Sequence, residues 1–339
     1  MQTELKILSI LSLLQNILTD LDKNGKIDSK KYVIEDTYGQ YDFIVPNMKP
    51  IEAINWLLTY ARPVGNPGAD MLFYENAQGY FFNSLQSLYK QNSAFTFFFD
   101  PKNVSGLNGR PNINKDLFNA IKFEILDNFD TLGAINKGTF ANRVITFDVL
   151  ARTRKVTDFN YNDYFNSSSS MNGSALTNNY QNRYGKYSFE EPPQDMEAGV
   201  LRLVAGNTDE QTSAYIEQRP GSVARSIYAE NYIPNRVAQI ALANHTRVRI
   251  TVPGNVDVCV GLTADFNVFG VAATTTQKSE RDPDPYLSGK YLVTAVRHVI
   301  TNISYITVIE LAKESNIKNY GAVDNTDATW TSVVAGGQK

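Results

Sequence analysis

The feature that most constrains the fold is an alternation of apolar and polar residues in the last third of the chain. Residues 247–252 read RVRITV and residues 256–260 read VDVCV, and the turn sequence PGN separates them. A period of two places every second side chain on one face of a strand. The sequence therefore predicts a β-hairpin over residues 247–260.

A second hairpin is predicted close behind the first. Tyr291–Ile300 and Ile303–Leu311 are rich in β-branched residues, and Thr301 and Asn302 lie between them. Both faces of these two strands carry apolar residues. A strand that is covered on both sides is typical of a barrel whose outside contacts another subunit.

The first third of the chain has the pattern of a mixed α and β unit. Residues 5–18 have leucine and isoleucine on most faces of a helix, which predicts a buried helix. The run is too short to span a bilayer and lacks the basic start and the cleavage site of a signal peptide. The other elements expected here are strands at 32–34 and 42–45, a helix from Pro50 that ends before Pro63, and a hairpin of 71–74 with 79–83.

The middle of the chain is less regular. Residues 92–114 contain the run Phe95–Phe99 and then become rich in Asn, Gly and Pro, which indicates a boundary. Strands are expected at 120–126 and 143–150. Residues 160–193 are polar but hold seven aromatic residues, which favours an ordered irregular insertion over a disordered linker. Residues 217–243 have a partly helical pattern that is interrupted at Pro220 and Pro234.

Composition excludes several classes of protein. The 339 residues include 32 Lys and Arg and 35 Asp and Glu, so the net charge of −3 is too small to steer the chain onto nucleic acid or a membrane surface. Cys259 is the sole cysteine, so no internal disulfide forms, which suits a reducing compartment. The 19 Tyr and 18 Phe lead us to expect large aromatic contact surfaces.

One motif resembles a calcium-binding loop. Asp20, Asp22, Asn24 and Asp28 surround Gly25 at the spacing of D-x-[DN]-x-[DN]-G. The twelfth position, where such a loop needs a bidentate glutamate, is Lys31. We favour a tight acidic turn here and keep a weak calcium site as the alternative.

Other candidate residues have two interpretations each. The carboxylates Glu190–Glu191 and Asp282/Asp284 have the composition of a glycosidase pair, but adjacent carboxylates in loops beside proline are typical of solvated turns. His245 and His298 are interpreted as structural rather than catalytic. Arg247 and Arg249 share one strand face, which indicates either a solvated outer face or a surface for acidic partners.

Taken together, the motifs resemble those of baseplate hub proteins of contractile-tailed phages. The similarity runs in order from Asp36 to Lys313, and Val248–Gly261 also resembles the barrel hairpin of type VI secretion spike proteins. The segments that carry it are DFIVPN (42–47) with Pro50 and AINWL (53–57), FYEN (73–76) with GYFFNSL (79–85), FANR (140–143) with FD (147–148) and FNY (159–161), SGKYLVTAVRH (288–298), YIT (305–307) and EL (310–311).

The resemblance implies a structural, non-enzymatic role without a cofactor or a metal. It implies an α+β, mostly β fold with an antiparallel tube-type β-barrel, a preceding mixed α/β domain and an irregular insertion domain. On this scheme the middle domain is 1–115, the barrel is 116–158 with 236–313, the insertion is 159–235 and the C-terminal tail is 314–339.

The same resemblance implies a location and partners. Hub proteins form a homotrimeric ring in the virion tail baseplate, assembled in the bacterial cytoplasm, which adapts a threefold central spike to a sixfold tail tube. Baseplate wedge components are further expected partners. Hubs present two barrels per chain, whereas this sequence accommodates one. We therefore expect either a shortened version of a longer hub or a second polypeptide that supplies the other barrel.

Two other functions are weighed against this one. A tail-associated peptidoglycan hydrolase requires a cleft with two convergent carboxylates. A carbohydrate-binding adhesion module requires exposed aromatic platforms and would bind glycans as a monomer.

Overall fold

The structure is a computed structural model. It describes residues 14, 31–37, 48–64, 68, 70–100, 117–128, 139–148, 152–161, 164–165, 168–173, 201–205, 233–269 and 283–317. The helices are α2 (Pro50–Leu58), α3 (Leu85–Tyr89) and α9 (Ile233–Ala243). The strands are β1 (Lys31–Ile34), β2 (Met71–Asn76), β3 (Gly79–Ser84), β4 (Phe95–Phe99), β5 (Lys122–Asn128), β6 (Ala141–Asp148), β7 (Thr153–Asn160), β8 (Leu201–Ala205), β9 (Thr246–Pro253), β10 (Thr263–Val268), β11 (Gly289–Ile300) and β12 (Tyr305–Lys313).

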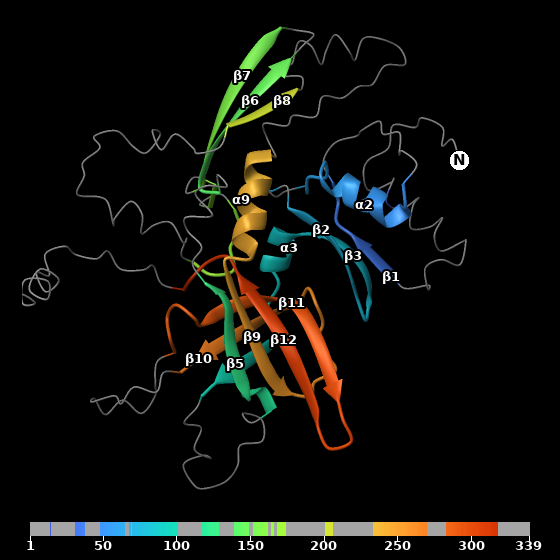
Figure 1. Cartoon of the computed structure of the whole chain (residues 1–339), viewed down its shortest axis with the longest axis vertical. Helices are drawn as coiled ribbons and strands as arrows, with labels where there is room; N and C mark the ends of the chain where they lie inside the picture. The colour runs from blue at the N-terminus through green and yellow to red at the C-terminus, as the bar shows by residue number, and fades with distance from the viewer. Residues whose placement is uncertain are drawn as a thin grey trace, which may run out of the picture.

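The largest unit is a curled sheet of six strands in the order β4-β10-β11-β12-β9-β5 (Figure 1). Its central pair is the predicted hairpin of β11 and β12, which confirms that prediction. The pairing between β4 and β10 is parallel, so the sheet departs from the purely antiparallel barrel that was expected. The broader expectation of an α+β, mostly β fold is confirmed.

The hairpin predicted over residues 247–260 is wrong in its second half. β9 pairs with β12 and β5, and the residues after Pro253 form turns rather than a strand. Val258 is 1% exposed in the core of the sheet, while Val256 is 75% exposed. These residues therefore form a loop that places the Val258 side chain in the core of the curled sheet. Within this loop the Asn255 side chain accepts a hydrogen bond from the Asp257 N–H, which forms a local turn.

The concave side of the sheet holds the main core. Apolar side chains from β4, β9, β10, β11 and β12 meet there, with aromatic rings in edge and tilted contacts. The two edge strands approach each other at Asn119, which bridges to Phe98, and the Ala120 amide donates to the Phe98 carbonyl at 2.6 Å. Phe99 and Phe123 also touch, with ring centroids 5.4 Å apart. The sheet is therefore a partly closed barrel.

The second unit is a three-stranded sheet in the order β1-β3-β2 with α2 on one face (Figure 1). β2 and β3 form the predicted hairpin with a two-residue turn. α2 starts at Pro50, and the Glu52 carboxylate accepts the Lys49 amide proton at 3.2 Å. The apolar face of α2 packs on β2 and β3, and Leu14 is buried in the same cluster. Leu14 is helical, as expected; the rest of the predicted helix 5–18 and the strand 42–45 lie outside the described residues.

The third unit is the sheet β7-β6-β8, at the top of Figure 1. α9 lies between this sheet and the six-stranded sheet. α9 begins at Ile233, so Pro234 lies in its first turn, where proline is tolerated because its missing N–H has no intrahelical partner. A start at this position agrees with the interruption expected at Pro234, and Pro220 lies outside the described residues.

The sheet pairing differs from the expected domain scheme in three places. β4 joins the six-stranded sheet, although residues 1–115 were assigned to the middle domain. β6 and β7 lie outside that sheet, although 116–158 were assigned to the barrel. Residues 314–316 are buried rather than the start of a tail. Local patterns reveal strands but not their partners, which accounts for these differences. The division into domains otherwise stays a prediction.

Candidate functional site

Several predicted site residues lie outside the described part of the chain. These are the calcium-type loop with Asp20, Asp22, Asn24 and Asp28, the pair Glu190 and Glu191, and Asp282. Lys31, at the twelfth position of the calcium-type loop, is the first residue of β1. The calcium alternative therefore stays a prediction.

Asp284 organises a turn before β11. Its Oδ1 accepts the backbone N–H groups of Tyr286 and Leu287, each at 2.8 Å. A carboxylate that accepts the amides two and three residues ahead is a turn-forming group. This geometry agrees with the turn interpretation of Asp284.

The two histidines occupy different environments. Burial lowers the pKa of His245 to about 4, and its Nδ1 lies 3.2 Å from Thr246 Oγ1. His298 is exposed on β11, where Nδ1 lies 3.1 Å from the Tyr305 hydroxyl and 3.3 Å from Thr307 Oγ1. Both side chains thus have local hydrogen-bond partners, as the structural interpretation expects.

Arg247 and Arg249 are paired with carboxylates of their own chain. Glu310 on β12 reaches both, at 3.2 Å from Arg247 Nη2 and 2.7 Å from Arg249 Nη2. On the other side, β5 supplies Asp127 to Arg247 at 3.1 Å and Glu124 to Arg249 at 3.6 Å. The acidic groups for this strand face therefore come from neighbouring strands of the same sheet.

A buried polar cluster, which sequence reasoning missed, lies at the foot of α9. Tyr164 accepts hydrogen bonds from the side-chain amides of Gln86 on α3 and Gln239 on α9. Asp70 lies beside them, and its Oδ2 accepts the Gln86 backbone N–H at 3.1 Å. Burial raises the pKa of Asp70 to about 6. Three separate stretches of sequence meet in this cluster, so no local motif announces it.

The end of β12 completes the same region. Glu314 Oε1 accepts the backbone N–H of Met171 at 2.6 Å and the Ser315 hydroxyl at 2.9 Å. Burial raises the pKa of Glu314. The preceding Lys313 donates instead to the carbonyl oxygens of Tyr286 and Ser288 and lies 4.9 Å from the centre of the Tyr291 ring.

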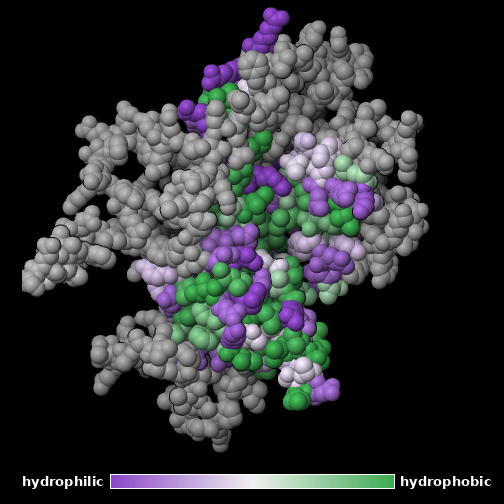
Figure 2. Space-filling model, in the orientation of Figure 1, coloured by the Kyte–Doolittle hydropathy of each residue, from purple (hydrophilic) through white to green (hydrophobic). Residues whose placement is uncertain are grey.

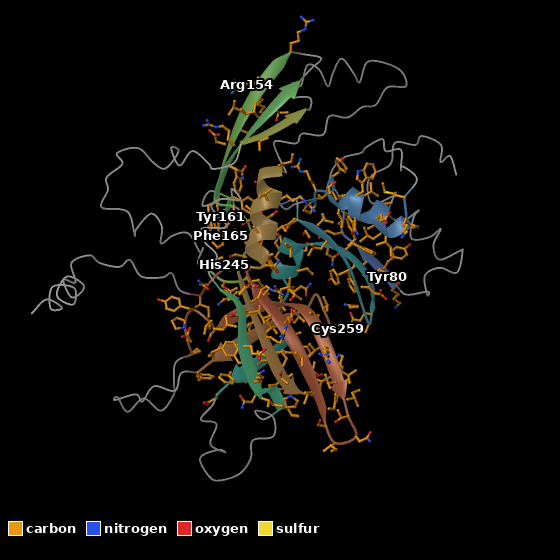
Figure 3. All side chains as sticks on the ribbon, in the orientation of Figure 1. Tyr80, Arg154, Tyr161, Phe165, His245 and Cys259 are labelled. Atoms are coloured by element: carbon orange, nitrogen blue, oxygen red, sulfur yellow. The ribbon has the colours of Figure 1, made fainter. Side chains whose placement is uncertain are left out.

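A small pocket opens inside this cluster. It has a volume of about 30 Å³ and is lined by Gln86, Tyr89, Tyr161, Tyr164, Phe165, Ser168, Ser169, Ser170, Gln239, Leu242 and Glu314. Figure 3 shows Tyr161, Phe165 and His245 along the lower end of α9. A space of this size holds one or two water-sized groups and is too small for a sugar ring.

Apolar residues are exposed at one end of the six-stranded sheet. Ile300 is 75% exposed and Ile303 is 98% exposed at the tip of the β11–β12 hairpin, near the exposed Val256. β10 pairs with β11 only from Gly289 to Leu292, so the distal half of β11 has β12 as its single paired neighbour among the described strands. Figure 2 shows hydrophobic and hydrophilic residues side by side on this lower part of the molecule.

The described aromatic residues contribute little to the exposed surface. Among the described large apolar side chains that are exposed, Tyr32 is the one aromatic residue, and all the others are Val, Leu or Ile. Most described Phe and Tyr rings pack against one another inside the chain. In the described residues, the rings fill the curled sheet and pack beside the lower end of α9. The expectation of large aromatic contact surfaces with other subunits stays a prediction.

No group of three or more His, Cys, Asp or Glu side chains in the described ranges is arranged to hold a metal ion. Within the same ranges, no helix has both the length and the apolar character needed to cross a membrane.

The chain is similar in sequence to a phage protein. The chain is 22% identical over 306 residues to the probable baseplate hub protein gp334 of Vibrio phage KVP40. The alignment covers 90% of this chain, but the chain spans only 66% of the length of that relative. This similarity confirms the resemblance to phage baseplate hub proteins that the sequence motifs indicate. The chain matches no protein-family profile.

Two solved structures are similar at a lower level. A tail protein from Neisseria meningitidis MC58 has a TM-score of 0.44 at 11% identity, covering 93% of this chain and 69% of that protein. The 43 kDa tail protein of prophage MuSo2 from Shewanella oneidensis has a TM-score of 0.42 at 8% identity, covering 91% and 64%.

Proposed function

We propose that this chain is a structural hub subunit of a phage contractile-tail baseplate. The observation that carries the proposal is the sequence similarity to a baseplate hub protein along 90% of the chain. The corresponding location is the baseplate of the virion tail. In this role the chain forms a homotrimeric ring that adapts a threefold central spike to a sixfold tail tube and contacts wedge components.

The six-stranded sheet supports this role. Its core is complete on the concave side, while the distal half of β11 and the hairpin tip expose aliphatic side chains. Exposed apolar surface of this kind marks protein contacts, because its desolvation favours association. Lumen-facing and ring-facing contacts of the trimer would therefore involve this sheet.

The proposed role is not enzymatic. The pocket of about 30 Å³ cannot hold a peptidoglycan sugar, and Glu314 is the one carboxylate among its lining residues. Glycoside hydrolysis needs two carboxyl groups on opposite sides of a bound sugar. This pocket therefore gives no support to the hydrolase alternative.

The test is the mass of the purified full chain in solution, by light scattering at micromolar concentration. The expected result is a trimer, and Ile303→Asp together with Ile300→Asp should weaken it. The matched control is Val64→Asp, an exposed apolar residue on a different unit. A stable monomer would contradict the ring. Lysis of cell walls in a turbidity assay, by folded protein, would contradict the structural role itself.

A further inference from the structure

Helix α3 joins the three-stranded sheet β1-β3-β2 to the six-stranded sheet. It follows β3 directly, lies between the two sheets, and leads into β4 of the larger one (Figure 1). A helix of five residues is too short to be stable by itself, so its orientation depends on contacts with its surroundings. The side chains that hold its two ends therefore determine how the two sheets are fixed relative to each other.

Two carboxylates from the three-stranded unit hold the start of α3. Glu35, directly after β1, accepts the Ser84 N–H at 2.6 Å and the Ser87 hydroxyl at 2.7 Å. The side chain of Asp70, directly before β2, accepts the Gln86 N–H at 3.1 Å. The first N–H groups of a helix lack intrahelical partners, so these carboxylates complete its first turn. The start of α3 is thus fixed to the ends of β1 and β2.

An ammonium group from the six-stranded sheet holds the end of α3. Lys290, the second residue of β11, is half-buried, and its Nζ donates to the carbonyl of Tyr89 at 2.8 Å and to that of Gln91. The last carbonyls of a helix have no intrahelical donor, and a lysine side chain is suited to supply one. Just beyond, the Thr263 hydroxyl of β10 donates to the Asn92 carbonyl at 3.1 Å, so the chain is part of the larger sheet from there on.

The remaining contacts across this junction are largely apolar. Leu85 and Leu88 of α3 pack with Leu292 of β11 in a small cluster. At the tip of the β2–β3 hairpin, Asn76 Nδ2 donates to the Val260 carbonyl at 3.2 Å. Units that share a small interface move relative to each other unless something fixes them. Apolar contacts have no preferred direction, whereas hydrogen bonds from a charged group do. The Lys290 contacts therefore set the angle of α3 on the larger sheet.

We propose that Lys290 is a latch that keeps the three-stranded unit in one orientation on the six-stranded sheet. With Glu35 and Asp70 at one end of α3 and Lys290 at the other, the short helix acts as a rigid joint. Release of Lys290 lets the unit turn about residues 90–91, which moves α2 relative to the larger sheet while both sheets stay folded. The inference concerns one chain and does not depend on the proposed hub function.

The experiment measures the distance between two spin labels on the full chain, at Ile51→Cys in α2 and Lys122→Cys in β5, with Cys259→Ser as background. Both labelled positions are exposed, and dilution with unlabelled chain restricts the measured pairs to one molecule. Lys290→Met keeps most of the side-chain length and removes the ammonium group. The expected result is a narrow distance distribution with Lys290 and one about twofold broader with Lys290→Met. An unchanged distribution would overturn the proposal.

The matched control is Lys90→Met, which removes an exposed ammonium group from the residue that ends the same helix. Its distance distribution should stay narrow, and equal broadening in both variants would overturn the latch. If Lys290→Met does not fold, hydrogen exchange of the unsubstituted chain provides the test. The amide protons of Lys90 and Gln91, which bond to the carbonyls of Gln86 and Leu88, should exchange only through the opening that also exposes β11. Faster exchange through a separate opening of α3 would overturn the proposal.

Discussion

The side-chain amide of Asn172 pairs with the backbone of Lys290 as a neighbouring strand would. Asn172 Oδ1 accepts the Lys290 N–H at 3.0 Å, and Nδ2 donates to the Lys290 carbonyl at 3.1 Å. Nδ2 also donates to the Ser315 carbonyl at 3.0 Å. Residues 168–173 are thus fixed to the start of β11 and to the residues that directly follow β12. Gly289 is needed beside it, because its φ of +133° disfavours other residues and a Cβ there would lie 2.8 Å from Asn172 Oδ1.

Asn172→Asp should destabilise the chain more than its small change in shape suggests. The substitution replaces the Nδ2 donor by an oxygen that faces the carbonyls of Lys290 and Ser315. Loss of buried hydrogen bonds with repulsion between acceptors predicts a loss of about 2–4 kcal/mol in the free energy of unfolding. Denaturant unfolding measures it. Asn302→Asp, at the exposed hairpin tip, is the control and should change stability little. Equal effects of the two substitutions would show that the Asn172 pairing contributes nothing.

Asp70 and His245 should make opposite contributions to the pH dependence of stability. Burial raises the pKa of Asp70 from 3.8 to about 6, so the folded state holds this proton more tightly and stability falls as pH rises through that range. Burial lowers the pKa of His245 from 6.5 to about 4, so stability falls as pH drops through that range. Each effect amounts to about 3 kcal/mol, and the two largely cancel in the wild-type chain.

Single substitutions separate the two contributions. Relative to the wild type, Asp70→Asn should gain stability as pH rises from 4 to 6, and His245→Gln should lose relative stability as pH rises from 4 to 6.5. Denaturant unfolding at several pH values in this interval measures both differences. The double variant should follow the wild-type curve within about 1 kcal/mol. Parallel curves for all four proteins would mean that neither group titrates in the folded state as its burial implies.

Part of this architecture is readable in the sequence, and part of it is not. The β11–β12 hairpin was predictable because both strands and their turn are contiguous, and α2 because Pro50 and its apolar stripe are local signals. The pairing of Phe95–Phe99 with β10 joins segments about 170 residues apart, and no local period encodes a partner. For the same reason, the sequence does not predict the buried environment of Glu314, since its neighbours Gln86 and Met171 are distant in sequence.

The charged face of β9 should contribute a small, salt-dependent stabilisation. Glu310→Gln removes the carboxylate that reaches both Arg247 and Arg249. Hydrogen bonds from Arg249 lower the pKa of Glu310, so the interaction is also lost at acidic pH. We expect a lower denaturation midpoint at low salt and a difference from wild type that shrinks towards about 1 M salt. The control is Asp257→Asn, because Asp257 is exposed and is not one of the carboxylates that pair with Arg247 or Arg249. A difference that does not change with salt would contradict an electrostatic origin.

Gly254 should be required because of Tyr305 rather than because of its own backbone conformation. The Gly254 N–H donates to the Tyr305 carbonyl at 2.9 Å, and a Cβ on Gly254 would lie 2.0 Å from Cδ1 of the Tyr305 ring. Gly254→Ala forces that ring to move and should cost about 1–3 kcal/mol of stability. Gly173→Ala is the control, because a Cβ there meets no atom within 4 Å. A double-mutant cycle with Tyr305→Ala measures the origin of the cost, since the Gly254→Ala penalty should largely vanish once the ring is gone. A penalty of the same size in both backgrounds would place the strain in the backbone of the turn instead.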